Sequence, residues 1–417
     1  MIGHSAALAA ALGRFEGLYP ETIHLSLDRI LTALDALGRP QDKLPPVIHV
    51  AGTNGKGSTC AFMRAMAEAA GLKTHVFTSP HLVRFNERIR LSGDIVDDHR
   101  LIDWLERTFK ALNGQEITHF EATTAAALLA FSEVPADVLI LEVGLGGSYD
   151  ATNVIDQPAL SVITPVDFDH KAFLGSDLRK IAGEKAGIIK ADRPVVTAIQ
   201  RKVCEQVIMK KAEEAGAPLY RLKAHFIDAM PEDLGLIGEH QRANAALAAM
   251  AMQLFGNSTR ISQADIFKGA RTASWPARMQ KLKSGPVTEF APEAEVWLDG
   301  GHNPHAARAI AKHLKSLPGK TVLVSAMLAS KDSTGYFMPF RRLRPQVFTL
   351  PNAPGHRGAE PQDLAEAART AGLDATACES LEGAMRAAAK TGAERILICG
   401  SLYLAGEVLA INGEPPV

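Results

Sequence analysis

The stretch Gly52-Thr53-Asn54-Gly55-Lys56-Gly57-Ser58 decides the fold, because it stands between an apolar run at residues 47–51 and a helical pattern at residues 58–70. Strand, glycine loop and helix in this order are the context of a phosphate-binding loop. Glycines let backbone N–H groups approach phosphate oxygens, and the helix N-terminus adds a favourable dipole. Lys56 would reach the β- and γ-phosphates and Ser58 would bind Mg²⁺, although a glycine separates them here. The alternative is a plain glycine turn before a helix.

Outward from this loop, short apolar runs alternate with helical patterns. Alternation of this kind predicts an α/β fold with a parallel, doubly wound sheet and helices on both faces. The predicted strands cover residues 47–51, 74–78, 138–143, 160–164 and 195–199. The predicted helices cover residues 27–37, 58–70, 181–188 and 243–254.

The length of 417 residues predicts two or three domains, since single cores stop growing near about 250–300 residues. Pro276, Gly285 and Pro286 mark a break at residues 275–286, after which the alternation starts again. We therefore expect a first domain at residues 1–284 and a smaller α/β domain at residues 285–417. Its predicted strands cover 296–299, 321–326, 346–350 and 395–399, and its helices 304–317 and 361–370.

Composition and charge exclude several classes of protein. Hydrophobic residues make up 47% and charged residues 22%, which is ordinary globular usage. Lys plus Arg number 45 against 46 for Asp plus Glu, and this balance argues against a nucleic-acid partner. The four cysteines form no CxxC pair and indicate free thiols in a reducing compartment. With no secretory signal and no long apolar stretch, we expect a cytoplasmic enzyme without a membrane partner.

Three polar residues follow predicted strands at the edge where the phosphate loop lies. Ser79, Glu142 and His170 come after the strands at 74–78, 138–143 and 160–164. Because ligands bind at the carboxyl ends of parallel strands, a hydroxyl, a carboxylate and an imidazole there suit Mg²⁺ bound to nucleotide phosphates. Each also has a structural reading, as a turn serine, a solvated rim carboxylate or a hydrogen-bonded histidine.

Two further motifs stand near this edge. The glycine loop Gly144-Leu145-Gly146-Gly147-Ser148-Tyr149-Asp150 allows close backbone approach, although any sharp loop would also use it. Lys185 lies in the helical pattern at 181–188, where it either pairs with Glu184 at the surface or faces the phosphate edge.

These motifs occur together with Ser79-Pro80-His81-Leu82, Thr118-His119-Phe120-Glu121, Glu184-Lys185-Ala186-Gly187-Ile188 and a closing Gly400-Ser401-Leu402-Tyr403-Leu404. The combination resembles the bifunctional folylpolyglutamate synthase/dihydrofolate synthase family of the Mur ligase superfamily, over nearly the whole chain. The resemblance implies a P-loop ATPase domain with a mainly parallel sheet and a smaller Rossmann-like C-terminal domain. Ser148 and Ala277 depart from the arginine and glycine usual in the family, and Ser330 precedes Lys331-Asp332 where an aspartate is common.

The resemblance also implies roles for individual residues. Lys56, His170 and Lys185 would be catalytic, and Lys185 would carry a carbamate. Mg²⁺ would be held by Ser58, Ser79, Glu142, His170 and Lys185. ATP would contact Thr53, Asn54, Gly55, Lys56, Gly57, Ser58, Asn244, Arg278, Asp299 and His302. Pteroate or folate would contact Thr118, His119, Phe120, Glu121, Tyr149, Asp150 and Ala151, although Phe120 could equally be a core residue.

The implied reaction is ATP-dependent addition of L-glutamate to dihydropteroate and to reduced folates through an acyl phosphate, and the resemblance favours a monomer. Two alternatives stay open. Another Mur-type ligase would use the same ATP machinery on a cell-wall precursor. A P-loop switch would use the nucleotide to change partner binding. Phosphate release that requires both a pteroate or folate and glutamate would exclude both alternatives.

Overall fold

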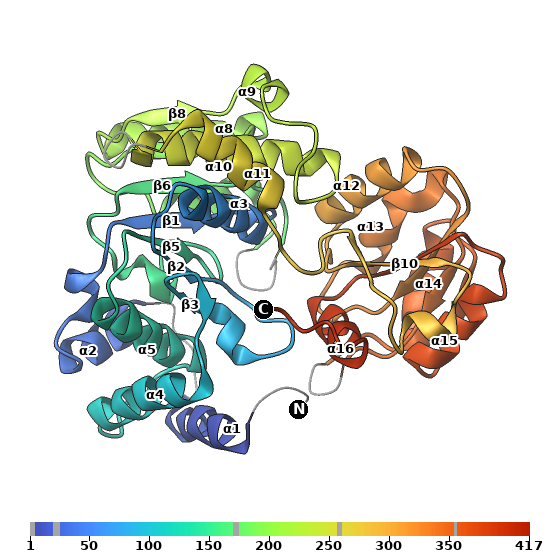
Figure 1. The fold of residues 1–417 in the computed structure, drawn as a ribbon, viewed down its shortest axis with the longest axis horizontal. Helices are drawn as coiled ribbons and strands as arrows, with labels where there is room; N and C mark the ends of the chain where they lie inside the picture. The colour runs from blue at the N-terminus through green and yellow to red at the C-terminus, as the bar shows by residue number, and fades with distance from the viewer. Residues whose placement is uncertain (1–4, 20–25, 170–174, 257–260, 354–356) are drawn as a thin grey trace.

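The computed structural model describes residues 5–19, 26–169, 175–256, 261–353 and 357–417. These residues form two α/β units, each with its own sheet (Figure 1). The larger sheet has the strand order β4-β3-β2-β5-β1-β6-β7-β8. Its strands are β1 (Val47–Ala51), β2 (Thr74–Phe77), β3 (Ile89–Leu91), β4 (Asp94–Ile95), β5 (Val138–Glu142), β6 (Leu160–Ile163), β7 (Val195–Thr197) and β8 (Leu219–Arg221).

The predicted parallel, doubly wound sheet is confirmed. Strands β2, β5, β1, β6, β7 and β8 are parallel to their neighbours, and β1 lies at the centre between β5 and β6. The hairpin of β3 and β4 adds an antiparallel edge that the sequence analysis did not predict. Because β1 is central, the phosphate loop that follows it opens at the middle of the sheet edge, where ligands of such sheets bind.

Alternate residues of the central strands enter cores on opposite faces of the larger sheet. Ile48 and Val50 pack on one face with helices α3 (Lys56–Ala69), α10 (Glu239–Gly256) and α11 (Gln263–Thr272). Val47 faces the other side, which helices α1 (Ala6–Gly13), α2 (Asp28–Ala36), α4 (Asp98–Leu112) and α5 (His119–Glu133) cover. Helices α7 (Leu178–Ala186) and α8 (Lys202–Glu214) pack together against β6 and β7, and α9 (Ala224–Asp228) follows β8. The period of two in the strands thus gives helices on both faces.

The second unit repeats this plan on a smaller scale, as predicted. Its strand order is β13-β12-β11-β14-β10-β9, with β9 (Gln280–Lys281), β10 (Glu295–Asp299), β11 (Thr321–Ser325), β12 (Val347–Thr349), β13 (Ala375–Ala377) and β14 (Arg395–Cys399). Only β9 is antiparallel within the described part of this sheet. Helices α12 (Pro304–Lys315), α13 (Ser333–Phe337) and α14 (Pro361–Thr370) cover one face, and α15 (Leu381–Ala389) and α16 (Leu402–Ile411) the other.

Strand β9 shows how the linker joins the two units. It lies within the predicted break at residues 275–286, yet it pairs with β10 of the second sheet. The chain therefore enters the second sheet a few residues before the domain boundary predicted after residue 284. Across the described ranges, none of the helices has the length and apolar character required to cross a membrane.

Candidate active site

The phosphate loop is shaped by close contacts that leave no room for side chains at its three glycines, Gly52, Gly55 and Gly57. Gly55 has φ +85°, and a Cβ there would lie 2.6 Å from the amide oxygen of Asn244 on α10. A Cβ at Gly57 would lie 2.9 Å from the indole nitrogen of Trp275. The loop is thus packed between α10 and the linker. Asn244, which sequence reasoning assigned to ATP, directly borders it.

Glu142 lies at the carboxyl end of β5, next to the phosphate loop on β1. Its carboxylate is buried, 4.0 Å from the ammonium of Lys56, and accepts a 3.2 Å hydrogen bond from the backbone N–H of Ser79. Burial raises the pKa of Glu142, and the charge of Lys56 opposes that shift. Because the carboxyl ends of parallel strands share one edge of the sheet, Glu142 and Ser79 lie together beside Lys56, as the sequence analysis expected.

The donors at this edge fit a divalent cation. Ser58, buried in the first turn of α3, and Ser79 supply hydroxyl oxygens, and Glu142 supplies a buried carboxylate. Within the ranges that the structure describes, no group of three or more His, Cys, Asp and Glu side chains is arranged to hold a metal. His170, the further predicted ligand, lies outside the described residues. Few protein ligands beside a phosphate loop are typical of Mg²⁺ that is held partly by nucleotide phosphates.

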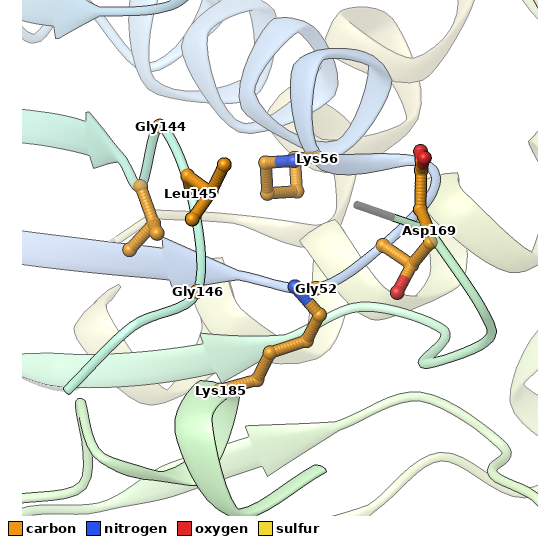
Figure 2. Close-up of a pocket in the computed structure, with 9 residues that line it drawn as sticks. Gly52, Lys56, Gly144, Leu145, Gly146, Asp169 and Lys185 are labelled. Atoms are coloured by element: carbon orange, nitrogen blue, oxygen red, sulfur yellow. The ribbon is translucent and has the colours of Figure 1, made fainter. Parts of the chain in front are cut away.

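The side chain of Lys185 lines a pocket beside the phosphate loop and, among the described residues, does not form an ion pair at the protein surface. The pocket is lined by Gly52, Thr53, Lys56, Val143, Gly144, Leu145, Gly146, Asp169 and Lys185. Figure 2 shows the Lys185 side chain extending from α7 toward the loop at Gly52. Only 5% of Lys185 is exposed. Burial, and next the positive charge of Lys56, lower the pKa of Lys185 to about 7. Its amine is therefore half neutral near physiological pH.

Sequence reasoning missed the polar contacts that join the phosphate loop to the second unit. Asn54 exchanges side-chain hydrogen bonds with Asn303 and His305, each at 3.0 Å. The loop after β6 reaches across as well, because Asp167 pairs with Arg308 at 2.7 Å and Asp169 pairs with Lys331 at 2.6 Å. The only signals in the sequence were the position of Asn303 beside His302 and the altered motif around Lys331.

The predicted ATP contacts of the second unit hold the linker. Asp299 is buried, and its two carboxylate oxygens accept from the backbone N–H groups of Met279 at 2.9 Å and Gly301 at 2.7 Å. His302 lies on the pocket side, with Nε2 3.5 Å from an Asp169 oxygen. Arg278 lines a second pocket between the units together with Ser79, Glu142 and Trp275. His302 and Arg278 therefore lie near the edge that carries the phosphate loop, whereas the carboxylate of Asp299 is bonded to the linker and to its own loop.

The predicted pteroate segments divide into two groups. Phe120 packs against Gly144, where a Cβ would lie 2.5 Å from its ring, and so borders the loop that lines the phosphate pocket. His119 stacks edge-on against Phe85 at 6.1 Å, and Tyr149 is exposed. Thr118 instead caps α5 through a reciprocal capping box with Glu121.

Asp150 is buried and already bonded within its own loop. One carboxylate oxygen accepts from the N–H of Leu145 at 2.8 Å, and the other from the hydroxyl of Thr152 at 2.6 Å and its N–H at 3.0 Å. The Thr152 hydroxyl is also 2.9 Å from Nε2 of His49, a buried residue of β1. Asp150 thus fixes the position of Leu145 in the pocket wall, and the neighbouring Ala151 is buried.

Comparison with known proteins identifies the family of this chain. Residues 50–225 match the family model of the Mur ligase middle domain, and residues 287–411 match the dihydrofolate synthetase C-terminal domain. The dihydrofolate synthase/folylpolyglutamate synthase of Escherichia coli is 32% identical over 98% of this chain and 96% of its own length. The chain belongs to the folylpolyglutamate synthase/dihydrofolate synthase family.

Solved structures of this family agree with the fold. A Mycobacterium tuberculosis folylpolyglutamate synthase complexed with ADP and AMPPCP is 29% identical and superposes with a TM-score of 0.86, covering 98% of this chain and 100% of its own. A bifunctional folylpolyglutamate synthase/dihydrofolate synthase with Mn, AMPPNP and L-glutamate bound is 32% identical, with a TM-score of 0.82 and 97% of both chains covered. Both of these family members thus bind a nucleotide, and the second also binds Mn and L-glutamate.

Within this family fold, Glu121 has a structural role that can be tested. Its carboxylate accepts two hydrogen bonds from Arg29 on α2, at 3.0 and 2.9 Å, and closes the capping box of α5. Both side chains are largely buried. Glu121→Ala should therefore lower the free energy of unfolding by about 2–4 kcal/mol, because it leaves a buried guanidinium without this partner. Urea unfolding measures the change.

The control is Glu205→Ala, which breaks an exposed pair with Arg221 and should cost within about 1 kcal/mol. An unchanged unfolding midpoint of the Glu121 variant, combined with a higher KM for pteroate, would contradict the structural role and favour direct contact with the substrate.

Proposed function

We propose that this chain uses ATP to join L-glutamate to dihydropteroate, forming dihydrofolate, and to extend reduced folates with further glutamates. One observation carries the proposal. The phosphate loop, the buried carboxylate of Glu142 and the buried amine of Lys185 surround one edge of the sheet, and the second unit contacts that edge through Asn303 and Lys331. Family membership supplies the substrate class. Because these groups all come from one chain, we further propose that a monomer is active, with domains at 1–284 and 285–417.

The chemistry follows from the poor reactivity of a carboxylate toward an amine. Transfer of the γ-phosphoryl group of ATP to the substrate carboxylate gives an acyl phosphate with a good leaving group. The amino group of glutamate then attacks the acyl carbon, the C–O bond to phosphate breaks, and the amide forms with loss of a proton. Lys56 neutralises charge that builds on the transferred phosphoryl group.

Ser58, Ser79 and Glu142, with His170 as a further proposed ligand, would hold a divalent metal, which when bound neutralises phosphate charge. Asn244, Arg278, Asp299 and His302 would help to place the nucleotide. Their positions support this role, since Asn244 borders Gly55 and Arg278 shares a pocket with Glu142.

For the pteroate ring, Phe120 and Asp150 are the best-supported contacts, because both border the loop at Gly144 and Leu145 that faces the phosphate pocket. His119 and Tyr149 would also contact the pteroate. Thr118, Glu121 and Ala151 would stabilise the segments that carry these contacts. The pteroate carboxylate would then lie toward Lys56, where the phosphoryl group arrives.

Lys185 would carry a carbamate. Its neutral amine attacks CO₂, a C–N bond forms and a proton is released, which turns the side chain into an anion. The lowered pKa supports this, because only the neutral amine reacts. The resulting carboxylate would lie among Lys56, the phosphate loop and the proposed metal. A plain lysine in this pocket would instead add to the positive charge of Lys56.

A phosphate-release assay over a matrix of substrates tests the proposal. We expect phosphate only when ATP, a divalent metal, glutamate and either dihydropteroate or a reduced folate are all present. Release with a cell-wall precursor instead would favour another Mur-type ligase, and release without glutamate would favour a nucleotide switch. The dual activity is tested by expression in a strain that lacks dihydrofolate synthase. Failure to restore growth at normal protein levels would contradict it.

A further inference from the structure

Asn303 is a buried side chain of the second unit that touches both sides of the phosphate pocket. It precedes α12, and its amide oxygen accepts the N–H of Ala306 at 2.9 Å as an N-cap. Its amide nitrogen donates to Oδ1 of Asn54 and to Oδ2 of Asp169, both at 3.0 Å. Both N–H groups and the carbonyl are thus used, and only 3% of the residue is exposed.

The two acceptors lie on different loops of the first unit. Asn54 belongs to the phosphate loop after β1, while Asp169 follows β6 and itself lines the pocket with Lys56 and Lys185 (Figure 2). The backbones of the two loops are already joined within the first unit, because the N–H groups of Thr53 and Asn54 donate to the carbonyl of Pro165. The Asn303 amide adds the contact that holds the side chains of Asn54 and Asp169 toward each other.

The rest of the network supports the same geometry. Because Oδ1 of Asn54 accepts from Asn303, its Nδ2 donates to Nδ1 of His305, 3.0 Å away on the same helix α12. Lys331 binds the other oxygen of Asp169, and both groups are nearly buried. By contrast, the ion pair of Lys312 with Glu239 joins the same two units through exposed side chains, 67% and 65% accessible. Exposed pairs hold units together weakly and do not reach the pocket.

We propose that Asn303 is a positioning residue that couples docking of the second domain to the shape of the phosphate pocket. When the domains separate, the side chains of Asn54 and Asp169 lose the donor that orients them toward each other, while the backbones of their loops stay joined through Thr53, Pro165 and Asp167. The phosphate pocket then binds the nucleotide tightly only after the second domain has docked. This limits ATP hydrolysis before glutamate is bound. The coupling rests on the proposed function only in taking ATP as the bound nucleotide.

The variant Asn303→Ser tests this, because serine keeps the N-cap of α12 but cannot donate to both loops. We expect kcat/KM for ATP to fall by about tenfold to a hundredfold, the effect of losing two buried hydrogen bonds, with the KM for pteroate changed less than threefold. Asn54→Ala should give a similar loss. The double variant should lose much less than the product of the two single losses, because both substitutions remove the hydrogen bond between Asn303 and Asn54.

Two controls separate coupling from general damage. Lys312→Ala breaks the exposed contact between the same units and should keep near wild-type kinetics. Thermal unfolding should show Asn303→Ser folded as stably as the Lys312 variant. Wild-type kcat/KM for ATP in Asn303→Ser, or losses that simply multiply in the double variant, would overturn the proposal.

Affinity for Mg²⁺–ADP, measured by calorimetry, separates this inference from the proposed function. Asn303→Ser should bind ADP at least about tenfold more weakly than wild type. If the wild-type protein shows no glutamate-dependent phosphate release but this loss of ADP affinity appears, the ligase proposal fails and the coupling stands. Equal ADP affinity in the two proteins would overturn the coupling, whatever the reaction catalysed.

Discussion

Replacement of Lys185 by alanine should reduce ligase activity by about 10²–10³-fold, the range for loss of one charge-stabilising group in a closed site. The side chain is 5% exposed, lines the pocket with Lys56 and Asp169, and carries a pKa near 7. If the active form of Lys185 is a carbamate, the alanine substitution removes a negatively charged carboxylate group from the pocket, and does not remove an ammonium group. Acetate or another short carboxylate should then restore part of the activity, as steady-state phosphate release would show.

The pH dependence of wild-type activity follows with a defined sign. Protonation of Lys185 removes the lone pair that attacks CO₂, so with bicarbonate present activity should fall as the pH drops through about 7. Depletion of CO₂ should lower the activity above this pH, and added bicarbonate should restore it there. Lys180→Ala, on the exposed side of the same helix, is the matched control and should keep full activity. An active Lys185→Ala enzyme, or one that acetate leaves unchanged, would contradict the carbamate.

The parallel architecture was predictable because it depends on local features. Residues 47–51 and 138–143 are apolar runs bounded by turn signals, and each forms a central buried strand. The hairpin of β3 and β4 and the short strand β9 escaped prediction, because residues such as Asp94 and Gln280 do not form an apolar run. Their pairing is decided by neighbouring strands and not by their own sequence.

The candidate site was predictable to the same extent. The carboxyl ends of parallel strands must share an edge, so Ser79 and Glu142 could be placed beside Lys56 from order alone. The capping box at Thr118 and Glu121 was also readable from its spacing, but was interpreted only as a binding motif. Contacts such as Asn54 with Asn303 depend on how two domains dock, which no local pattern encodes.

Glu142→Gln should lower kcat/KM by about 10²–10³-fold and raise the Mg²⁺ concentration needed for half-maximal activity. Glutamine keeps the shape of the side chain but removes the charge that faces Lys56 at 4.0 Å. A neutral amide is a weak ligand for a hard cation, and Lys56 would lose the anion beside it. Titration of Mg²⁺ and Mn²⁺ in the phosphate-release assay measures both effects. Glu213→Gln, an exposed substitution on α8, should change neither.

Stability should move differently from activity in this variant. Burial raises the pKa of Glu142 in the folded protein, so ionisation of this group opposes folding at pH values above its unfolded value. The variant avoids that cost, and its melting temperature at pH 8 should equal or exceed that of the wild type. The difference should shrink as the pH falls toward about 4, where the wild-type carboxyl becomes neutral as well. A large loss of stability at pH 8 would instead show that the ion pair with Lys56 holds the fold together, and the activity loss could then no longer be assigned to the metal.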